Sequence, residues 1–193
     1  MAGHARYTAV LDACVLYPAC VADALMSMAV AGLYAAKWTT RIEQEWLRNL
    51  GRDRPEIAGK LVRRRDLMRQ AIPDWEVPEA ASDAVASGLA LPDPGDVHVL
   101  AAAIAGHADC IVTANLKDFP ANVLDVHGLS AIHPDDFLIA QFDLDSIAAL
   151  AAFKEMRARS KSPPLTPEEF AGAFERNGLV AMAERLRVAA ELI

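Results

Sequence analysis

The stretch from Leu91 to Pro120 constrains the fold more than any other part of the chain, because it combines a helix, a buried strand and several carboxylates. Apolar residues recur at helical spacing from Val97 to Ile104, directly after Asp96. The short apolar run Cys110–Val112 follows, and such runs are typical of strands covered on both faces of a parallel sheet. The sequence therefore predicts an α/β fold with this strand in a parallel sheet.

Polar residues come directly after two of the predicted strands. Thr113, Asn115 and Asp118 follow the apolar run, and Asp12 follows the β-prone run Tyr7–Leu11. In open α/β sheets, ligands bind beyond the carboxyl ends of the strands. We therefore expect these side chains at one edge of the sheet, although capping of the next helix is an equally good role for Asp12.

The turn that contains Asp93 and Asp96 has two interpretations. Asp93 followed by Pro94 is typical of a helix N-cap with proline at the first helical position, and Asp96 then lies in the first turn. An acid in the first turn also stabilises the positive end of the helix. Both acids thus have a structural explanation, and both are candidates for a functional site.

The predicted helix Thr40–Leu50 carries two further candidate acids, Glu43 and Glu45. Every fourth residue from Ile42 onward is apolar, which marks the buried side of this helix. Positions two apart are separated by roughly 200° around a helix, so only one of the two acids can face a given site. The helical wheel slightly favours Glu43, and a solvated surface position is the alternative for either residue.

Positive charge is concentrated in one region of an otherwise acidic chain. The net charge is −7, yet nine of the 19 Lys and Arg residues lie between positions 41 and 69. Arg63, Arg64 and Arg65 occupy the predicted helix Pro55–Ile72. Such clustering indicates a surface that contacts phosphates, and a solvated helix with pairs of opposite charge is the alternative.

The length of 193 residues fits one domain with an appendage. We expect the α/β domain over residues 1–138 and an all-helical C-terminal extension over residues 139–193. Further helices are predicted at 23–36, 80–88, 144–159, 167–177 and 179–193, and further strands at 37–39, 74–77 and 130–133.

The composition favours a reduced, cytoplasmic setting. The three cysteines form no CxxC pair and no disulfide framework. No signal peptide is evident, because His4, Arg6 and Tyr7 interrupt the start of the chain before any apolar run forms. The apolar stretch 19–36 contains Asp23, and we interpret it as a buried helix rather than a membrane span.

Carboxylates that converge without His or Cys ligands suit hard cations such as Mg²⁺ or Mn²⁺. Divalent ions in such a site can activate water and stabilise the departing oxygen of a phosphodiester. A phosphatase of the haloacid dehalogenase type is disfavoured, because Cys14 stands where that family needs a second Asp. A dinucleotide-binding fold is disfavoured because no Gly-x-Gly-x-x-Gly motif follows the first strand.

Taken together, these residues resemble the PIN domain, and in particular the PIN nucleases that include the VapC toxins of prokaryotic toxin–antitoxin pairs. The resemblance extends over about residues 6–138. The motifs that carry it are Leu11-Asp12, Glu45-Trp46, Asp93-Pro94-Gly95-Asp96 with Ala102 and Ala103, and the run from Val112 to Pro120.

The resemblance implies a set of site residues. The implied catalytic residues are Asp12, Glu45, Asp96 and Asp118; the implied metal ligands are Asp12, Asp96 and Asn115; and Glu43, Asp93 and Thr113 are second-rank candidates. The family pattern, an acid followed by an apolar residue, selects Glu45 over Glu43. Asn115 stands where the family often has Asp, so Asp118 is the alternative source of that charge, although an Asn carbonyl oxygen can still bind a metal ion.

By resemblance, the chain is expected to be a Mg²⁺- or Mn²⁺-dependent endoribonuclease, that is, a metal-dependent phosphodiester hydrolase. The clustering of positive charge predicts Arg63, Arg64 and Arg65 as its RNA-binding residues. The resemblance also implies a cognate antitoxin and a homodimer, and the interpretation of stretch 19–36 as a buried helix predicts no membrane association. The alternative is a PIN-like module that binds RNA or protein without turnover. The presence of Asp12, Glu45 and Asp96 favours the enzyme.

Overall fold

The computed structural model describes residues 6–193, which form two compact units. The first unit contains the described residues up to Tyr17 together with Tyr34–His133, and the second contains Pro18–Leu33 together with Pro134–Ile193. The segment Pro18–Leu33 thus belongs to the same compact unit as the C-terminal helices. The domain boundary after residue 138 stays a prediction.

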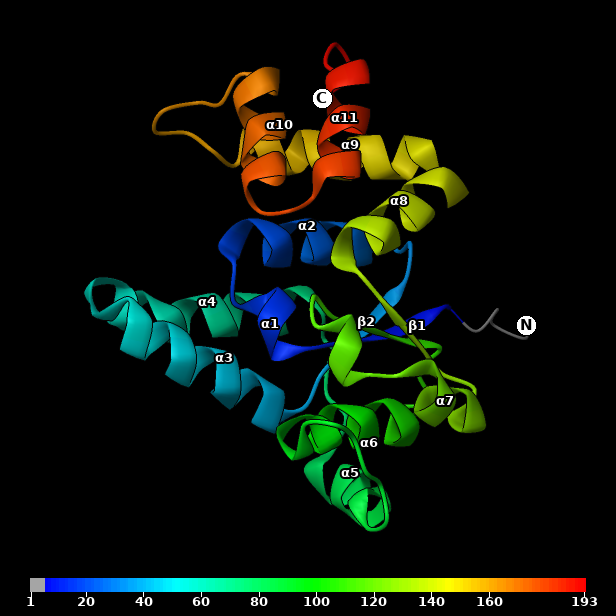
Figure 1. Cartoon of the computed structure of the whole chain (residues 1–193). Coiled ribbons are helices and arrows are strands. Elements are labelled where there is room, and N and C mark those ends of the chain that lie inside the picture. The colour runs from blue at the N-terminus through cyan, green and yellow to red at the C-terminus, as the bar shows by residue number, and fades with distance from the viewer. Residues whose placement is uncertain (1–5) are drawn as a thin grey trace. The chain divides into compact units, whose positions relative to one another are not determined.

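The first unit is built on a parallel sheet with the strand order β2-β1-β3-β4 (Figure 1). The strands are β1 (Thr8–Leu11), β2 (Ala35–Lys37), β3 (Cys110–Val112) and β4 (Ser130–Ile132). Every pair of adjacent strands is parallel. The prediction of a parallel sheet flanked by helices is therefore confirmed.

Helices of the first unit flank this sheet, and α5 and α6 pack closely against each other (Figure 1). They are α1 (Ala13–Leu16), α3 (Thr40–Asp53), α4 (Ala58–Ala71), α5 (Glu79–Ala86), α6 (Val97–Ala105) and α7 (Ala121–Leu124), with 3₁₀ helices at Pro55–Ile57 (η1), Pro94–Asp96 (η2), Leu116–Asp118 (η3) and Asp125–His127 (η4).

The central strands β1 and β3 bring two polar residues to one edge of the sheet. The last three residues of β1 and all of β3 are completely buried, as their apolar sequences predict. The register pairs Leu11 with Val112. The next residues, Asp12 and Thr113, therefore leave the sheet side by side at its carboxyl edge.

The helix predicted over residues 23–36 is wrong at both ends, because α2 spans Ala19–Val30. Gly32 adopts a φ of 82°, a left-handed conformation that costs glycine little. The N–H of Leu33 then donates to the Met28 carbonyl at 3.2 Å, as in a Schellman-type helix end. The chain turns at this point and enters β2 at Ala35, two residues earlier than predicted.

The segment predicted as a strand at 74–77 makes only a single bridge, between Trp38 and Glu76. The Trp38 N–H donates to the Trp75 carbonyl and the Val77 N–H donates to the Trp38 carbonyl, both at 3.0 Å. The segment is flanked by Pro73 and Pro78, which lack the N–H that a longer ladder would need.

The second unit consists of helices, as predicted for the C-terminal part of the chain. They are α2, α8 (Pro134–Leu144), α9 (Ser146–Ala158), α10 (Pro167–Arg176) and α11 (Val180–Val188). Helix α2 packs against α8, α9 and α10, and Phe153, Phe170 and Phe174 make edge-to-face contacts in the core. Within residues 6–193, no helix has the length and hydrophobicity needed to cross a membrane.

Candidate active site

Asp12 lies directly after β1 and has only 4% of its surface exposed. Its Oδ2 atom accepts hydrogen bonds from the Thr113 hydroxyl at 2.7 Å and from the Cys14 thiol at 3.0 Å. The Asp12 side chain makes no capping hydrogen bond to α1, so helix capping does not account for this carboxylate. The two contacts fix its orientation at the carboxyl ends of β1 and β3.

A cavity of about 350 Å³ opens beside Asp12. Four of the predicted site residues line it, namely Asp12, Glu45, Asp96 and Asn115. Residues that the sequence did not single out for a site line the rest, among them Cys14, Tyr17, Trp46, Asn49, Arg52 and Asp53. The acids from β1, α3 and η2 thus reach one cavity, although they are distant in the sequence.

Asp96 ends η2 and precedes α6, where it lies partly buried. Its pKa is raised to about 6, first by burial and then by four neighbouring carboxylates, those of Asp12, Asp93, Asp118 and Glu45. Like charges that approach one another disfavour their ionised forms. A bound cation would remove this penalty, so the electrostatics of the cavity favour a positively charged ligand.

The two glutamates of α3 have different surroundings. Glu43 is 2% exposed, and its carboxylate receives two hydrogen bonds from the Arg69 guanidinium, at 2.6 and 2.9 Å. Arg69 in turn stacks over the Trp75 ring at 4.5 Å. Glu43 therefore joins α3 to α4, whereas Glu45 lines the cavity.

His98, two residues after Asp96, lies between Glu45 and the turn before α6. Its Nδ1 is 2.6 Å from the Gly95 carbonyl oxygen, which can only accept, so Nδ1 carries a hydrogen. Its Nε2 is 3.3 Å from Glu45 Oε2, although the alignment does not make a hydrogen bond. A buried imidazole beside the proposed acid was not anticipated, because the apolar face predicted for this helix, with Val97, Leu100 and Ile104, does not include position 98.

Asp93 and Thr113 have roles that hydrogen bonds define. Asp93 Oδ1 accepts from the Gly95 N–H at 2.7 Å and so caps η2, as the sequence predicted. The Thr113 hydroxyl donates to Asp12 and also accepts from the Asn115 N–H at 3.0 Å. Thr113 thereby connects the end of β3 to the loop that carries Asn115.

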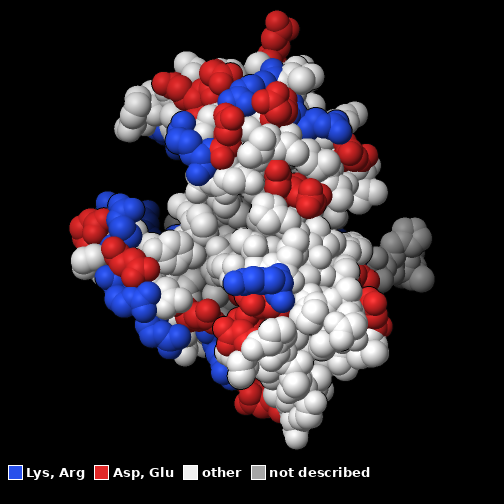
Figure 2. All heavy atoms as spheres, viewed as in Figure 1, with Lys and Arg blue, Asp and Glu red and all other residues white. Residues whose placement is uncertain are grey.

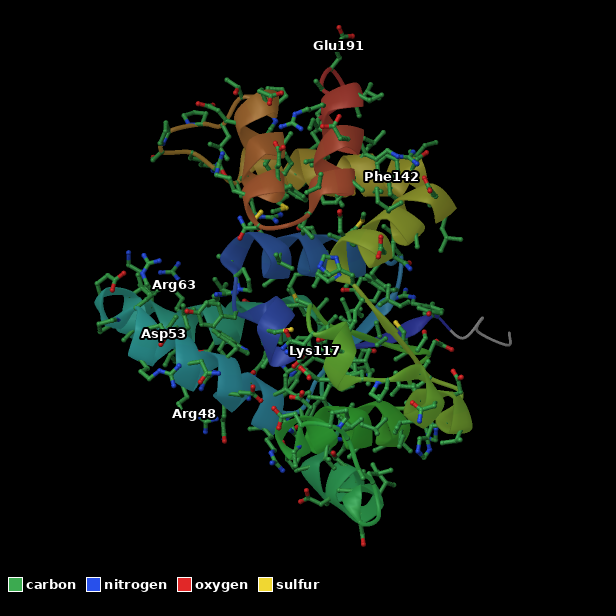
Figure 3. The ribbon with its side chains drawn as sticks, viewed as in Figure 1. Arg48, Asp53, Arg63, Lys117, Phe142 and Glu191 are labelled. Carbon is green, nitrogen blue, oxygen red and sulfur yellow. The ribbon has the colours of Figure 1, made fainter. Side chains whose placement is uncertain are left out.

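Asp118 lies at the end of η3, next to but outside the lining of the cavity. It is close enough for its charge to raise the pKa of Asp96. On this face of the first unit, Figure 2 shows acidic side chains beneath one basic residue, at the place where Figure 3 labels Lys117. Asn115, rather than Asp118, therefore supplies the lining residue of this loop.

The three predicted RNA-binding arginines differ in exposure and in their partners. The Arg64 guanidinium donates to the carbonyls of Leu16 and Tyr17, at 2.5 and 3.2 Å, and lies over the Trp46 ring. Arg65 pairs with its neighbour Asp66. Only Arg63 of the three is fully exposed, and Figure 3 shows it projecting from α4.

The cavity fits a hard divalent cation in the type and charge of its donor atoms. The carboxylates of Asp12, Glu45 and Asp96 and the amide oxygen of Asn115 are the ligands that Mg²⁺ and Mn²⁺ prefer. As they stand, however, no three His, Cys, Asp or Glu side chains of residues 6–193 are arranged so that they could hold a metal ion.

Comparison with known proteins agrees with this architecture. The sequence model of the family described as "PIN domain" matches residues 8–117, and the model described as "VapC50 C-terminal domain" matches residues 134–188. Because the first match covers more than half of the chain, the chain belongs to the PIN domain family, and the resemblance seen in the sequence is confirmed.

A Mycobacterium tuberculosis protein, named "Putative ribonuclease VapC50", is 45% identical to this chain over 79 residues. The matched stretch covers 41% of this chain and 47% of the relative, so the comparison spans about half the length of that protein. No solved structure matches the chain.

Proposed function

We propose that this chain is a Mg²⁺-dependent endoribonuclease of the VapC type and the toxin of a toxin–antitoxin pair, with Mn²⁺ as a substitute ion. The observation that carries the proposal is the convergence of Asp12, Glu45 and Asp96 on one cavity, with the pKa of Asp96 raised to about 6. Such acids suit a cation that neutralises them. The name of the Mycobacterium tuberculosis relative, "Putative ribonuclease VapC50", supports RNA as the substrate.

In this mechanism, Asp12, Asp96 and Asn115 would hold the ion. When bound, a divalent ion supplies Lewis acidity toward the phosphodiester and lowers the pKa of water. The Thr113 hydroxyl keeps Asp12 in a fixed orientation through its Oδ2 atom. Glu45 would accept a proton from the attacking water, and its carboxylate lies 3.3 Å from His98 Nε2.

Asp118 and Arg63 have supporting roles in the proposal. Asp118 adds negative charge next to Asp96 and is the remaining catalytic candidate of the loop. Arg63, exposed on α4, contacts the RNA backbone as a positive charge, whereas Arg64 keeps the end of α1 in place.

The proposal includes an antitoxin that restrains the enzyme, a second copy of the chain in a homodimer, and a cytoplasmic setting. Cys14, Cys20 and Cys110 are free thiols, which suits a reducing compartment.

The direct test is cleavage of a defined RNA by the purified chain with Mg²⁺, with Mn²⁺ and with a chelator. We expect cleavage with either ion and none with the chelator. Asp12→Asn should abolish cleavage, whereas the matched control Asp136→Asn, an exposed acid of α8, should cleave as the wild type does. RNA binding without cleavage under all conditions would instead identify a binding module without turnover.

A further inference from the structure

The cavity continues beyond the acids along α3. Glu45, Asn49 and Arg52 occupy positions i, i+4 and i+7, so they lie on one face of the helix, and all three line the cavity. At a rise of 1.5 Å per residue, Asn49 lies about 6 Å and Arg52 about 10 Å from Glu45 along the helix axis. Figure 3 labels Arg48 and Asp53 on this helix, and Asp53 is its last residue. This second half of the cavity therefore begins about 6 Å from Glu45 along the axis of α3.

Tyr17 places an aromatic ring in this half of the cavity. Its hydroxyl donates to Asp53 Oδ2 at 3.2 Å, and Asp53 Oδ1 accepts from Arg52 Nε at 2.9 Å. The ring, which comes from the end of α1, is thus held by the end of α3. A fixed, half-buried ring in an open cavity offers a face on which an unstacked base can lie.

Asn49 also lines this half of the cavity, and its side chain has no hydrogen-bond partner among the described residues, 6–193. Tyr17 and Arg52, by contrast, both donate to Asp53. A side-chain amide presents a donor and an acceptor side by side. This is the arrangement that pairs with the edge of a nucleobase in two hydrogen bonds.

The size and charge of the cavity point to the same occupant. A volume of about 350 Å³ is at the small end of the range for ligand pockets. Arg52 and Asp53 pair with each other in this half, so among the described residues no uncompensated positive charge lines it to attract a second phosphate. A flat, uncharged group with hydrogen-bonding edges satisfies both the ring and the amide.

We propose that Tyr17 and Asn49 form a nucleobase subsite, in which a base of single-stranded RNA stacks on Tyr17 and pairs with Asn49 while its neighbouring phosphate lies at the acids. This inference rests on the proposed ribonuclease function and assigns the base specificity of that function to two residues.

The test uses short single-stranded RNAs that differ only in the base next to the scissile phosphate, with cleavage sites mapped by sequencing. The wild type should prefer one base at a fixed distance from the cut. Asn49→Ala should lower that preference by about tenfold, the value of one bidentate amide–base contact. The control Gln44→Ala, an exposed amide of α3 outside the cavity, should keep it. An unchanged preference in Asn49→Ala overturns the subsite and leaves the ribonuclease proposal standing.

Tyr17 is tested by two variants that separate its ring from its hydroxyl. Tyr17→Ala should raise KM by about tenfold through loss of stacking, whereas Tyr17→Phe should stay near the wild type. The affinity for Mn²⁺, measured by calorimetry, should be the same in the two Tyr17 variants, in Asn49→Ala and in Gln44→Ala. Equal affinities would show that the acids are intact in all four. Equal KM values for Tyr17→Ala and Tyr17→Phe would remove Tyr17 from the subsite.

If the wild type cleaves no RNA with either ion, the proposed function fails, and binding then decides the subsite. Fluorescence anisotropy with short homopolymers of the four bases should show an affinity that depends on the base and that Asn49→Ala makes uniform. Affinities of the wild type that are independent of the base would overturn the subsite as well.

Discussion

Helix α3 carries chemically identical side chains into two different environments. On the α4 side, Glu43 is buried and neutralised by a guanidinium of the same chain, whereas on the cavity side Glu45 faces other carboxylates. The chain thus supplies a cation at one position and leaves negative charge uncompensated at the other. Glu43, which pairs with a cationic side chain of the same chain, is therefore structural. Glu45, which lies among other carboxylates, favours binding of a cation from solution.

The largest expected effect that separates these environments is on catalysis. Glu45→Gln should lower the rate of RNA cleavage at saturating Mg²⁺ by at least about 100-fold, because it removes a proposed proton acceptor. Its free energy of unfolding should change by less than about 0.5 kcal/mol, since Glu45 is partly exposed. Single-turnover kinetics and urea unfolding provide the two measurements. A variant with full activity would return Glu45 to a solvated surface role.

Glu43→Gln should show the opposite pattern. Loss of one partner leaves a charge without compensation in the α3–α4 interface, and we expect a loss of stability of about 3 kcal/mol, toward the low end for buried pairs because Arg69 is partly exposed. Cleavage at a temperature well below unfolding should be nearly unchanged.

A double replacement sharpens the structural interpretation of Glu43. Glu43→Leu combined with Arg69→Met should recover most of the stability, since apolar side chains of similar size can replace a buried pair. A double variant as unstable as the single one would show that the pair does more than join the two helices. Denaturant unfolding of all three variants measures this.

Arg63 and Arg64 differ in the same way, because Arg63 is exposed to solvent and Arg64 is bonded to the protein backbone. Arg63→Glu should weaken RNA binding several-fold and reduce the slope of log affinity against log salt by about 1, the value of one phosphate contact. Arg64→Gln should instead lower stability, because it releases the carbonyls of Leu16 and Tyr17. An unchanged salt slope in Arg63→Glu would leave α4 as a solvated surface.

The smallest expected effect is the pH dependence that Asp96 contributes without metal. Its folded-state pKa of about 6 lies above the ordinary value of 3.8, so the folded chain binds a proton that the unfolded chain does not bind between these values. The contribution of Asp96 to stability therefore rises as pH falls through about 6.

Asp96→Asn imitates the protonated form and should raise Tm by about 2 °C near pH 8 in chelator, a modest value because the group is partly exposed. This advantage over the wild type should shrink toward pH 5. Thermal unfolding of both proteins across this range is the measurement. An advantage independent of pH would mean that the neighbouring carboxylates do not act on Asp96.

The sequence predicts the positions of the central strands, whereas it does not predict the partners of the two glutamates. Apolar runs followed by polar residues located β1, β3 and the position of Asp12, because both faces of these strands are covered and the pattern is local. The roles of Glu43 and Glu45 depend on Arg69 and His98, which lie 26 and 53 positions away, and helical periodicity contains no information about such partners. The early end of α2 depends on a single left-handed glycine within an apolar run, which hydrophobicity alone does not distinguish from helix.

Because α2 belongs to the second unit, the chain cannot be divided into two stable fragments at the boundary between the two family matches. The match to the PIN domain, residues 8–117, includes α2, while the match to the C-terminal domain, residues 134–188, contains the helices that α2 packs against. A fragment that stops at His133 would therefore carry α2 as an apolar helix without its companions, and it should aggregate when it is expressed alone. Supplying residues 134–193 as a separate polypeptide should restore solubility, because these residues provide the helices that cover α2.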